Sequence, residues 1–236
     1  MQERLQKYMA RCGVASRRKC EEIILQQVVY INDELVTELG AKVDSEKDVV
    51  KCNGKTITPE ENKVYIIMNK PEDVITSVKD EKDRTTVIDL IDVKERIYPI
   101  GRLDYDTSGL LLLTNDGEIY NKIIHPRVNI NKVYVALVDG IFTEDEMFEF
   151  EEGIDIGDYV TSESAIKILN TYSNNCEVQI TIHEGKNRQV KRMCEYFNHN
   201  VISLKRIQVG EFTLDNLEKG DFRYLTEKEL NYLKSL

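Results

Sequence analysis

The first apolar residues of the chain recur every three or four positions, which is the spacing of one face of an α-helix. They are Leu5, Tyr8, Met9 and Cys12. Gly13 follows at the position where a residue in the left-handed conformation commonly ends a helix. Ser16 can cap a second helix. The inward face of that helix would comprise Cys20, Ile23, Ile24 and Gln27. The pattern therefore predicts two short helices at the start of the chain.

Two pairs of short strand-like runs come next, and each pair is interrupted by a turn dipeptide. The predicted pairs are residues 28–31 with 34–37 around Asn32-Asp33, and residues 48–51 with 55–57 around Asn53-Gly54. Asn, Asp and Gly accept the positive φ angles of a two-residue hairpin turn. We therefore predict a compact helix–helix–sheet module over residues 1–58, followed by a polar linker at residues 59–63.

From residue 64 onward, strand-like and helix-like patterns are mixed. The predicted strands are 64–68, 110–114, 133–138, 178–182 and 201–204. The predicted helices are 117–124, an acidic amphipathic helix from Thr143, and a helix after Gly185. The mixture of both element types predicts an α+β domain over residues 64–236.

Composition changes this picture little. A hydrophobic content of 41% is typical of a globular protein. No run of about 18 apolar residues occurs, so we expect a soluble cytoplasmic protein with neither a membrane span nor a secretory signal. The five cysteines form no Cys-x-x-Cys pair and the three histidines are scattered. We therefore expect reduced cysteines and no metal site.

Charge is strongly segregated along the chain, although its net value is −10. Residues 141–160 contain eight acidic side chains and no Lys or Arg. The basic residues of segment 1–20 are Arg4, Lys7, Arg11, Arg17, Arg18 and Lys19, against one acid. Those of segment 184–206 are Lys186, Arg188, Lys191, Arg192, Lys205 and Arg206, against two acids. Two such basic patches favour a polyanionic partner despite the negative total.

Cations stand at two predicted helix starts, where they oppose the helix dipole. Arg17 and Arg18 begin the second helix, and Lys186 and Arg188 precede the helix after Gly185. This placement costs about 0.3–1 kcal/mol per exposed charge, and a bound phosphate would offset it. The alternative is an ordinary solvated face. In the later helix, Val190, Met193, Cys194 and Phe197 would face the core, with Arg188, Lys191 and Arg192 on the other side.

The loop at residues 101–109 places charge beside a strongly apolar strand. Arg102, Asp104 and Asp106 stand together with Thr107 and Ser108 directly before four leucines. Asp and Ser are also common turn residues, so this composition alone has a purely structural explanation. A carboxylate at the edge of a core nevertheless needs a partner or a chemical role.

With these motifs in place, the chain resembles the RsuA-type ribosomal RNA pseudouridine synthases. Gly101-Arg102-Leu103-Asp104 with residues 107–117 is similar to the signature motif of that family, and residues 184–193 are similar to its C-terminal motif. Residues 1 to about 58 resemble its S-four-like RNA-binding domain. Segments 15–19 and 104–109 are most similar to the RluB-like branch, which modifies 23S RNA.

The resemblance implies a fold and an activity. The catalytic domain would be built on a mixed, largely antiparallel sheet flanked by helices. It would isomerise a flipped-out uridine of ribosomal RNA to pseudouridine without cofactor or metal. Asp104 matches the catalytic carboxylate, Tyr134 the active-site aromatic and Lys191 the basic partner of the aspartate. Many synthases of neighbouring families have Arg at the position of Lys191. Arg188 and Arg102 are the alternative cations that could pair with the aspartate. Covalent and glycal routes both stay open, and both require an ionised aspartate.

We expect ribosomal RNA, in a precursor or an assembling subunit, to be the partner of a monomeric enzyme that makes no membrane contact. The residues expected to contact RNA are Arg4, Lys7, Arg11, Ser16, Arg17, Arg18, Arg102, Lys186, Arg188 and Arg192. Three alternatives remain. They are a 16S-specific enzyme, a non-catalytic RNA-binding assembly factor, and a glycoside hydrolase with Asp104 and Asp106 about 5 to 9 Å apart.

Overall fold

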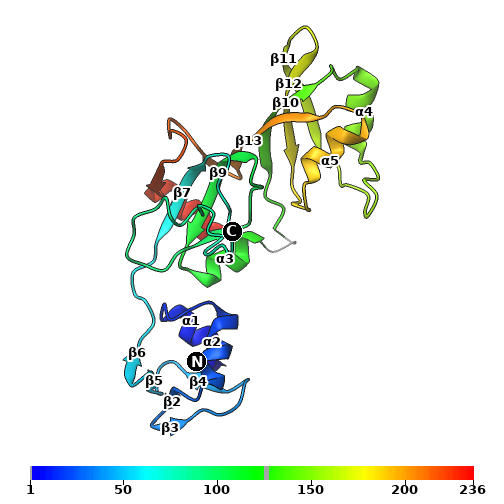
Figure 1. Cartoon of the computed structure of the whole chain (residues 1–236). Coiled ribbons are helices and arrows are strands. Elements are labelled where there is room, and N and C mark those ends of the chain that lie inside the picture. The colour runs from blue at the N-terminus through cyan, green and yellow to red at the C-terminus, as the bar shows by residue number, and fades with distance from the viewer. Residues whose placement is uncertain (1, 125–127) are drawn as a thin grey trace. The chain divides into compact units, whose positions relative to one another are not determined.

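The computed structural model describes residues 2–124 and 128–236 (Figure 1). It contains two compact units. The N-terminal unit comprises Met1–Val64, Val93–Arg96 and Asn115–Gly117, and the C-terminal unit comprises Tyr65–Asp92, Ile97–Thr114 and Glu118–Leu236. None of the helices in the described ranges combines the length and the apolar character that a membrane crossing requires.

The N-terminal unit joins two helices to a small antiparallel sheet. Its elements are β1 (Gln2–Arg4), α1 (Leu5–Arg11), α2 (Arg17–Leu25), β2 (Val29–Ile31), β3 (Glu34–Leu35), β4 (Lys42–Asp44), β5 (Val50–Cys52) and β6 (Lys55–Ile57). The sheet order is β3-β2-β5-β6, and β1 pairs separately with β4. Both predicted hairpins are confirmed, since Asn32, Asp33, Asn53 and Gly54 all have positive φ.

The two predicted helices are confirmed, with two corrections. Ser16 caps α2 by accepting a hydrogen bond from the backbone N–H of Lys19 at 3.2 Å. Gln27 was expected on the inward face, but α2 ends at Leu25 and Gln27 is exposed with φ 58°. The spacing of Arg4, Lys7 and Arg11 also predicts a basic stripe along the first helix. Arg4 instead ends β1, because a strand pairing with β4 extends to that residue.

The C-terminal unit is built on one long sheet. Its strands are β7 (Tyr65–Lys70), β8 (Tyr98–Ile100), β9 (Thr107–Thr114), β10 (Lys132–Asp139), β11 (Ala165–Thr171), β12 (Asn175–Ile182), β13 (Val201–Val209), β14 (Phe212–Thr213) and β15 (Phe222–Tyr224). The order is β11-β12-β10-β13-β9-β7-β15, with β14 on β13 and β8 on β9. The described pairings are antiparallel except β9 with β13, so the predicted mixed, largely antiparallel sheet is confirmed.

Four helices flank this sheet: α3 (Gly117–Ile124), α4 (Glu144–Glu152), α5 (Gln189–Tyr196) and α6 (Glu227–Ser235). Helices α4 and α5 lie beside β10 and β12 (Figure 1). They meet through an aromatic cluster of Phe142, Phe150 and Phe197, whose ring centroids are 5.9 to 6.2 Å apart. Ile119 of α3 and Leu233 of α6 share a second core with β7 and β9. The helices thus cover both ends of the sheet and fix the central strands.

Strand β9 lies at the centre of the C-terminal unit. All eight of its residues are buried, because β7 flanks it on one side and β13 on the other. The loop before β9 holds the charged residues of segment 101–109. The sheet therefore fixes one end of that loop in the most rigid part of the unit.

Candidate active site

The loop carrying Asp104 connects β8 to β9 and is tied down by its backbone. The backbone N–H of Thr107 donates to the carbonyl of Asp104 at 3.2 Å. Thr76 Oγ1 donates to the carbonyl of Leu103 at 2.7 Å. The Asp104 side chain keeps 37% of its surface exposed. The loop thus holds a carboxylate at the edge of the core. Hydrogen bonds fix its backbone, and its side chain remains partly exposed to solvent.

Lys191 reaches this loop from the first turn of α5. Its Nζ lies 2.5 Å from Asp106 Oδ1 and 3.5 Å from Asp104 Oδ2. The hydrogen bond from Lys191 lowers the pKa of Asp106. Helical spacing predicts that Lys191 lies with Arg188 and Arg192 on the side away from the core. This is wrong for Lys191, since only 6% of its side chain is exposed. The loop at 101–109 covers it.

The two other candidate partners of Asp104 line the same cavity as Asp104 but form no ion pair with it among the described residues. Arg188 caps the start of α5 with φ 51°, and its guanidinium is 3.8 Å from Glu195. Arg102 is exposed, and within the described residues no ion pair joins it to Asp104. Of the three cations considered from the sequence, the structure brings Lys191 to the aspartate.

A cavity of about 620 Å³ opens in front of these groups. Asp104, Lys191 and Tyr134 all line it. Apolar residues form much of its wall, among them Ile100, Leu112, Ile182, Val190 and Leu204. Tyr134 of β10 is only 8% exposed and, unlike the neighbouring Val133, lines the cavity. Alternation along the strand predicts that Tyr134 faces a different environment from Val133, and this is confirmed, although both residues are buried. The cavity can therefore hold a planar base against the Tyr134 ring, with the Asp104 carboxylate in the same wall.

Lys70 is a part of the site that sequence reasoning missed. The side chain is completely buried at the end of β7. Its Nζ donates to the carbonyls of Pro71 at 2.9 Å, Asp104 at 3.1 Å and Thr107 at 2.9 Å. Burial lowers its pKa to about 8. The sequence signal is a lysine two positions after the apolar strand 64–68, separated from it by Asn69. Lys70 holds the backbone of the Asp104 loop from inside the core.

Gly109 explains why the motif needs a glycine in β9. It has φ +109°, and an added Cβ would lie 2.1 Å from the carbonyl oxygen of Arg206 in β13. We expect Gly109→Ala to destabilise the protein by several kcal/mol, since backbone strain adds to a backbone clash. Urea unfolding of the purified variant measures this. Gly54→Ala is a suitable control, because its φ is also positive but no atom lies within 4 Å. Equal losses in the two variants would contradict the argument from close strand approach.

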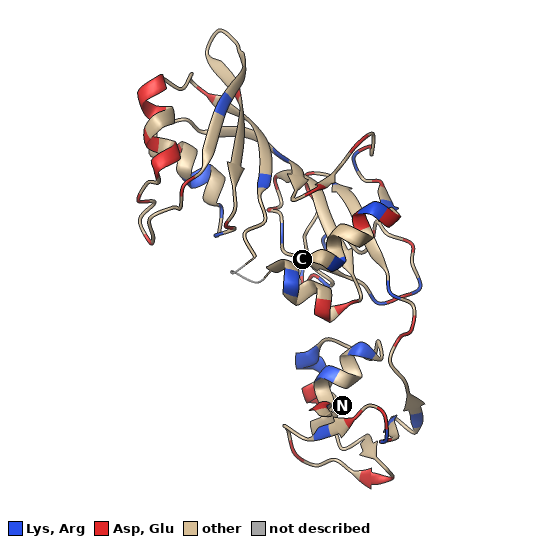
Figure 2. Ribbon diagram, turned by 180° about the vertical axis from the view of Figure 1, so that it is seen from behind, with Lys and Arg blue, Asp and Glu red and all other residues tan. Residues whose placement is uncertain are grey.

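The basic residues of segment 1–20 differ in whether an acidic side chain of the protein already pairs with them. Arg17 and Arg18 are exposed at the start of α2. Lys7 and Arg11 instead form ion pairs of 3.6 and 3.2 Å with the buried Glu3. Arg4 is exposed, and Ser16 uses its hydroxyl in the helix cap. Figure 2 shows Lys and Arg gathered on the two helices of the N-terminal unit.

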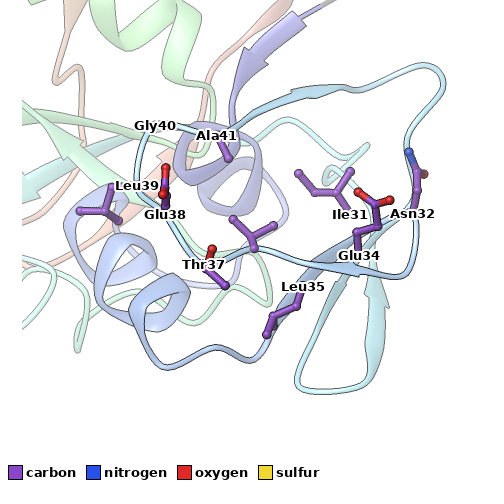
Figure 3. A pocket seen from close by; sticks show the side chains of 10 residues that line it. Ile31, Asn32, Glu34, Leu35, Thr37, Glu38, Leu39, Gly40 and Ala41 are labelled. Atoms are coloured by element: carbon purple, nitrogen blue, oxygen red, sulfur yellow. The ribbon is translucent and has the colours of Figure 1, made fainter.

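A second hollow, of about 670 Å³, lies in the N-terminal unit between residues 31 and 41 (Figure 3). Its charged side chains are Glu34 and Glu38, and both are exposed. Two carboxylates make this hollow unsuited to a polyanion. The cations on α1 and α2 are the better candidate RNA contacts of the N-terminal unit.

Two of the cations expected to contact RNA surround Tyr159. Lys186 Nζ lies 5.2 Å and the Arg192 guanidinium carbon 5.9 Å from the centroid of the Tyr159 ring. Arg192 also donates to Asp158 and to the carbonyl of Ile156. It does not line the cavity, whereas Lys186 and Arg188 do. Lys186 and Arg188 therefore lie closer to the reacting groups than Arg192 does.

Two known families match the two units. Residues 64–196 match the RNA pseudouridylate synthase family, and residues 3–50 match the S4 domain. The chain belongs to the RNA pseudouridine synthase family. The members of this family are enzymes. The α+β fold and the N-terminal RNA-binding domain predicted for this chain are both confirmed. In the described ranges, no three His, Cys, Asp or Glu side chains gather as metal ligands, and His125 lies outside those ranges.

Individual synthases are similar over nearly the whole chain. Ribosomal large subunit pseudouridine synthase B of Bacillus subtilis is 47% identical over 237 residues, covering 99% of this chain and 96% of the relative. The dual-specificity RNA pseudouridine synthase RluF of Escherichia coli is 36% identical, covering 96% and 77%. A crystal structure of a pseudouridylate synthase superposes with a TM-score of 0.71 at 30% identity, covering 98% and 99%.

Proposed function

We propose that this synthase converts a specific uridine of 23S ribosomal RNA to pseudouridine, with Asp104 as its catalytic carboxylate. The observation that carries the proposal is the contact of Asp104 with the buried Lys191 at the wall of an aromatic-lined cavity. The choice of 23S RNA is supported by the Bacillus subtilis relative, whose name assigns it to the large ribosomal subunit.

The reaction is an isomerisation, so its atoms balance within the uridine. The bond between N1 and C1′ breaks, the base turns, a bond forms between C5 and C1′, and the proton of C5 is lost while N1 gains one. Asp104 can attack C1′ or remove the 2′ proton, and it needs the ionised form for either step. The ammonium group of Lys191 lies 3.5 Å from Asp104 Oδ2 and is the cation that faces this carboxylate in the structure.

Tyr134 and the apolar wall hold the base during this reaction. A uridine flipped out of the RNA can stack on the Tyr134 ring, and Leu112 and Val190 exclude water beside it. We propose that Lys186, Arg188 and Arg102 contact the strand at the cavity, and that Arg17 and Arg18 bind phosphates from the N-terminal unit. We place the linker between the two units at residues 59–63.

The test is pseudouridine mapping of 16S and 23S RNA from cells that lack this protein, complemented with the wild type or with Asp104→Ala. We expect one 23S site to disappear and to return only with the wild type. A 16S site would overturn the choice of RNA and leave the enzyme intact. If Asp104→Ala restored the site, the catalytic role of Asp104 would be wrong.

A further inference from the structure

Arg206 is a buried cation for which the described residues supply no partner of opposite charge. It lies on β13, is 6% exposed and lines the cavity. Its Nε donates to the carbonyl of Leu110 at 2.8 Å. In the described part of the chain this is the one hydrogen bond of the Arg206 side chain, and no carboxylate forms an ion pair with it. The bond to Leu110 fixes the guanidinium and leaves its two terminal nitrogens for a ligand.

Lys132 is a second cation at the same cavity, and it is half-buried. It lies on β10, and its Nζ donates to the carbonyls of His183 at 2.8 Å and Ile130 at 3.2 Å. Burial, followed by the charge of Arg206, lowers the pKa of Lys132 to about 8, while Glu184 opposes this in part. The two cations are therefore close enough to destabilise each other.

The acids of the cavity are engaged with other groups. Asp104 and Glu184 are the two carboxylates among its described lining residues. Asp104 pairs with Lys191. Glu184 accepts hydrogen bonds from the Ser162 backbone at 2.9 Å and from Gln189 Nε2 at 2.8 Å. Among the described residues, no acid forms an ion pair with the buried Arg206 or the half-buried Lys132, although the charge of Glu184 offsets that of Lys132 in part. This arrangement is costly unless a ligand supplies further negative charge.

We propose that Arg206 and Lys132 bind one phosphate of the RNA strand, next to the uridine that enters the cavity. This inference rests on the proposed function. A guanidinium fork can bind two phosphate oxygens at once, and the ammonium group adds a point charge. The neutral carbonyl groups of uracil would leave both charges uncompensated. Contact with the phosphate would fix the nucleotide by its backbone while Asp104 acts on its sugar.

The first test uses the wild-type protein alone. Uridine, uridine 3′-monophosphate and uridine 5′-monophosphate are compared as competitors of a fluorescent fragment of ribosomal RNA. We expect one of the two monophosphates to bind about tenfold more tightly than uridine, the effect of one charge-assisted contact. Equal binding of all three would overturn the inference.

Variants then assign this preference to residues. Arg206→Gln should remove it and leave uridine binding unchanged. Lys205→Gln is the matched control, because it removes the same charge from the adjacent position of β13 but does not line the cavity. If Arg206→Gln fails to fold, Lys132→Gln is the second variant. A preference that persists in the folded variant, or that disappears equally in Lys205→Gln, would overturn the inference.

These outcomes are separable from the proposed function. Pseudouridine formation is measured by the mapping experiment, which depends on Asp104. A wild-type enzyme that forms pseudouridine but binds uridine and its monophosphates equally would refute the phosphate site alone. Loss of the product in every assay would instead refute the proposed function.

Discussion

Replacing Lys191 by Met is expected to lower the rate constant of pseudouridine formation by roughly a hundredfold or more, as when other preorganised electrostatic partners are removed. Lys191 is the buried cation that contacts both Asp104 and Asp106. Without it, both carboxylates lose the cation that they share, and Asp104 loses its electrostatic partner at the reacting sugar. Single-turnover kinetics with saturating RNA measure this rate separately from binding.

Two further variants test whether the lower rate of Lys191→Met comes from the loss of this particular positive charge. Lys191→Arg keeps the charge and should retain more of the rate than Lys191→Met, because a guanidinium can also pair with carboxylates. Lys167→Met removes an exposed lysine of β11 outside the cavity and should leave the rate unchanged. A Lys191→Met enzyme of nearly wild-type rate would show that Asp104 needs no cation.

The Asp104 motif could be identified from the sequence because its residues are contiguous. Position 104 and the leucines of β9 lie within one short segment, and the structure keeps them together at one edge of the core. The burial of Lys191 could not be predicted in the same way. Helical periodicity shows which face packs on the underlying sheet, but Lys191 is covered by a loop that lies 85 residues earlier in the sequence.

Several strands absent from the sequence prediction are short, although the missed β11 has seven residues. β8 has three residues including Pro99, and β15 has three residues that pair with β7. Such strands form because a partner strand supplies the hydrogen bonds, and local propensity contributes little. Lys70 was missed for a related reason. Lysine is rarely buried, and its three acceptors come from two separate segments of the chain.

Replacing Lys70 by Met is expected to lower the free energy of unfolding by about 3 kcal/mol or more, since one buried and two partly buried hydrogen bonds to carbonyls are lost. The loop bearing Asp104 should lose its fixed position, so the rate should fall as well. Urea unfolding and single-turnover kinetics measure the two effects. Lys219→Met is the control, because Lys219 forms an exposed pair with Glu72 and should contribute less than about 1 kcal/mol. Similar losses in both variants would contradict the argument.

The pH dependence of the Lys70→Met effect tests the burial of this charge. The pKa of Lys70 is lowered from 10.5 to about 8, so the unfolded chain binds the proton more tightly than the folded protein. Between these two values the unfolded state carries more protons, and the stability of the wild type therefore gains from rising pH. The variant lacks this gain. The stability difference between wild type and Lys70→Met should accordingly grow from pH 7 to pH 10, and a constant or shrinking difference would mean that Lys70 is not buried as a cation.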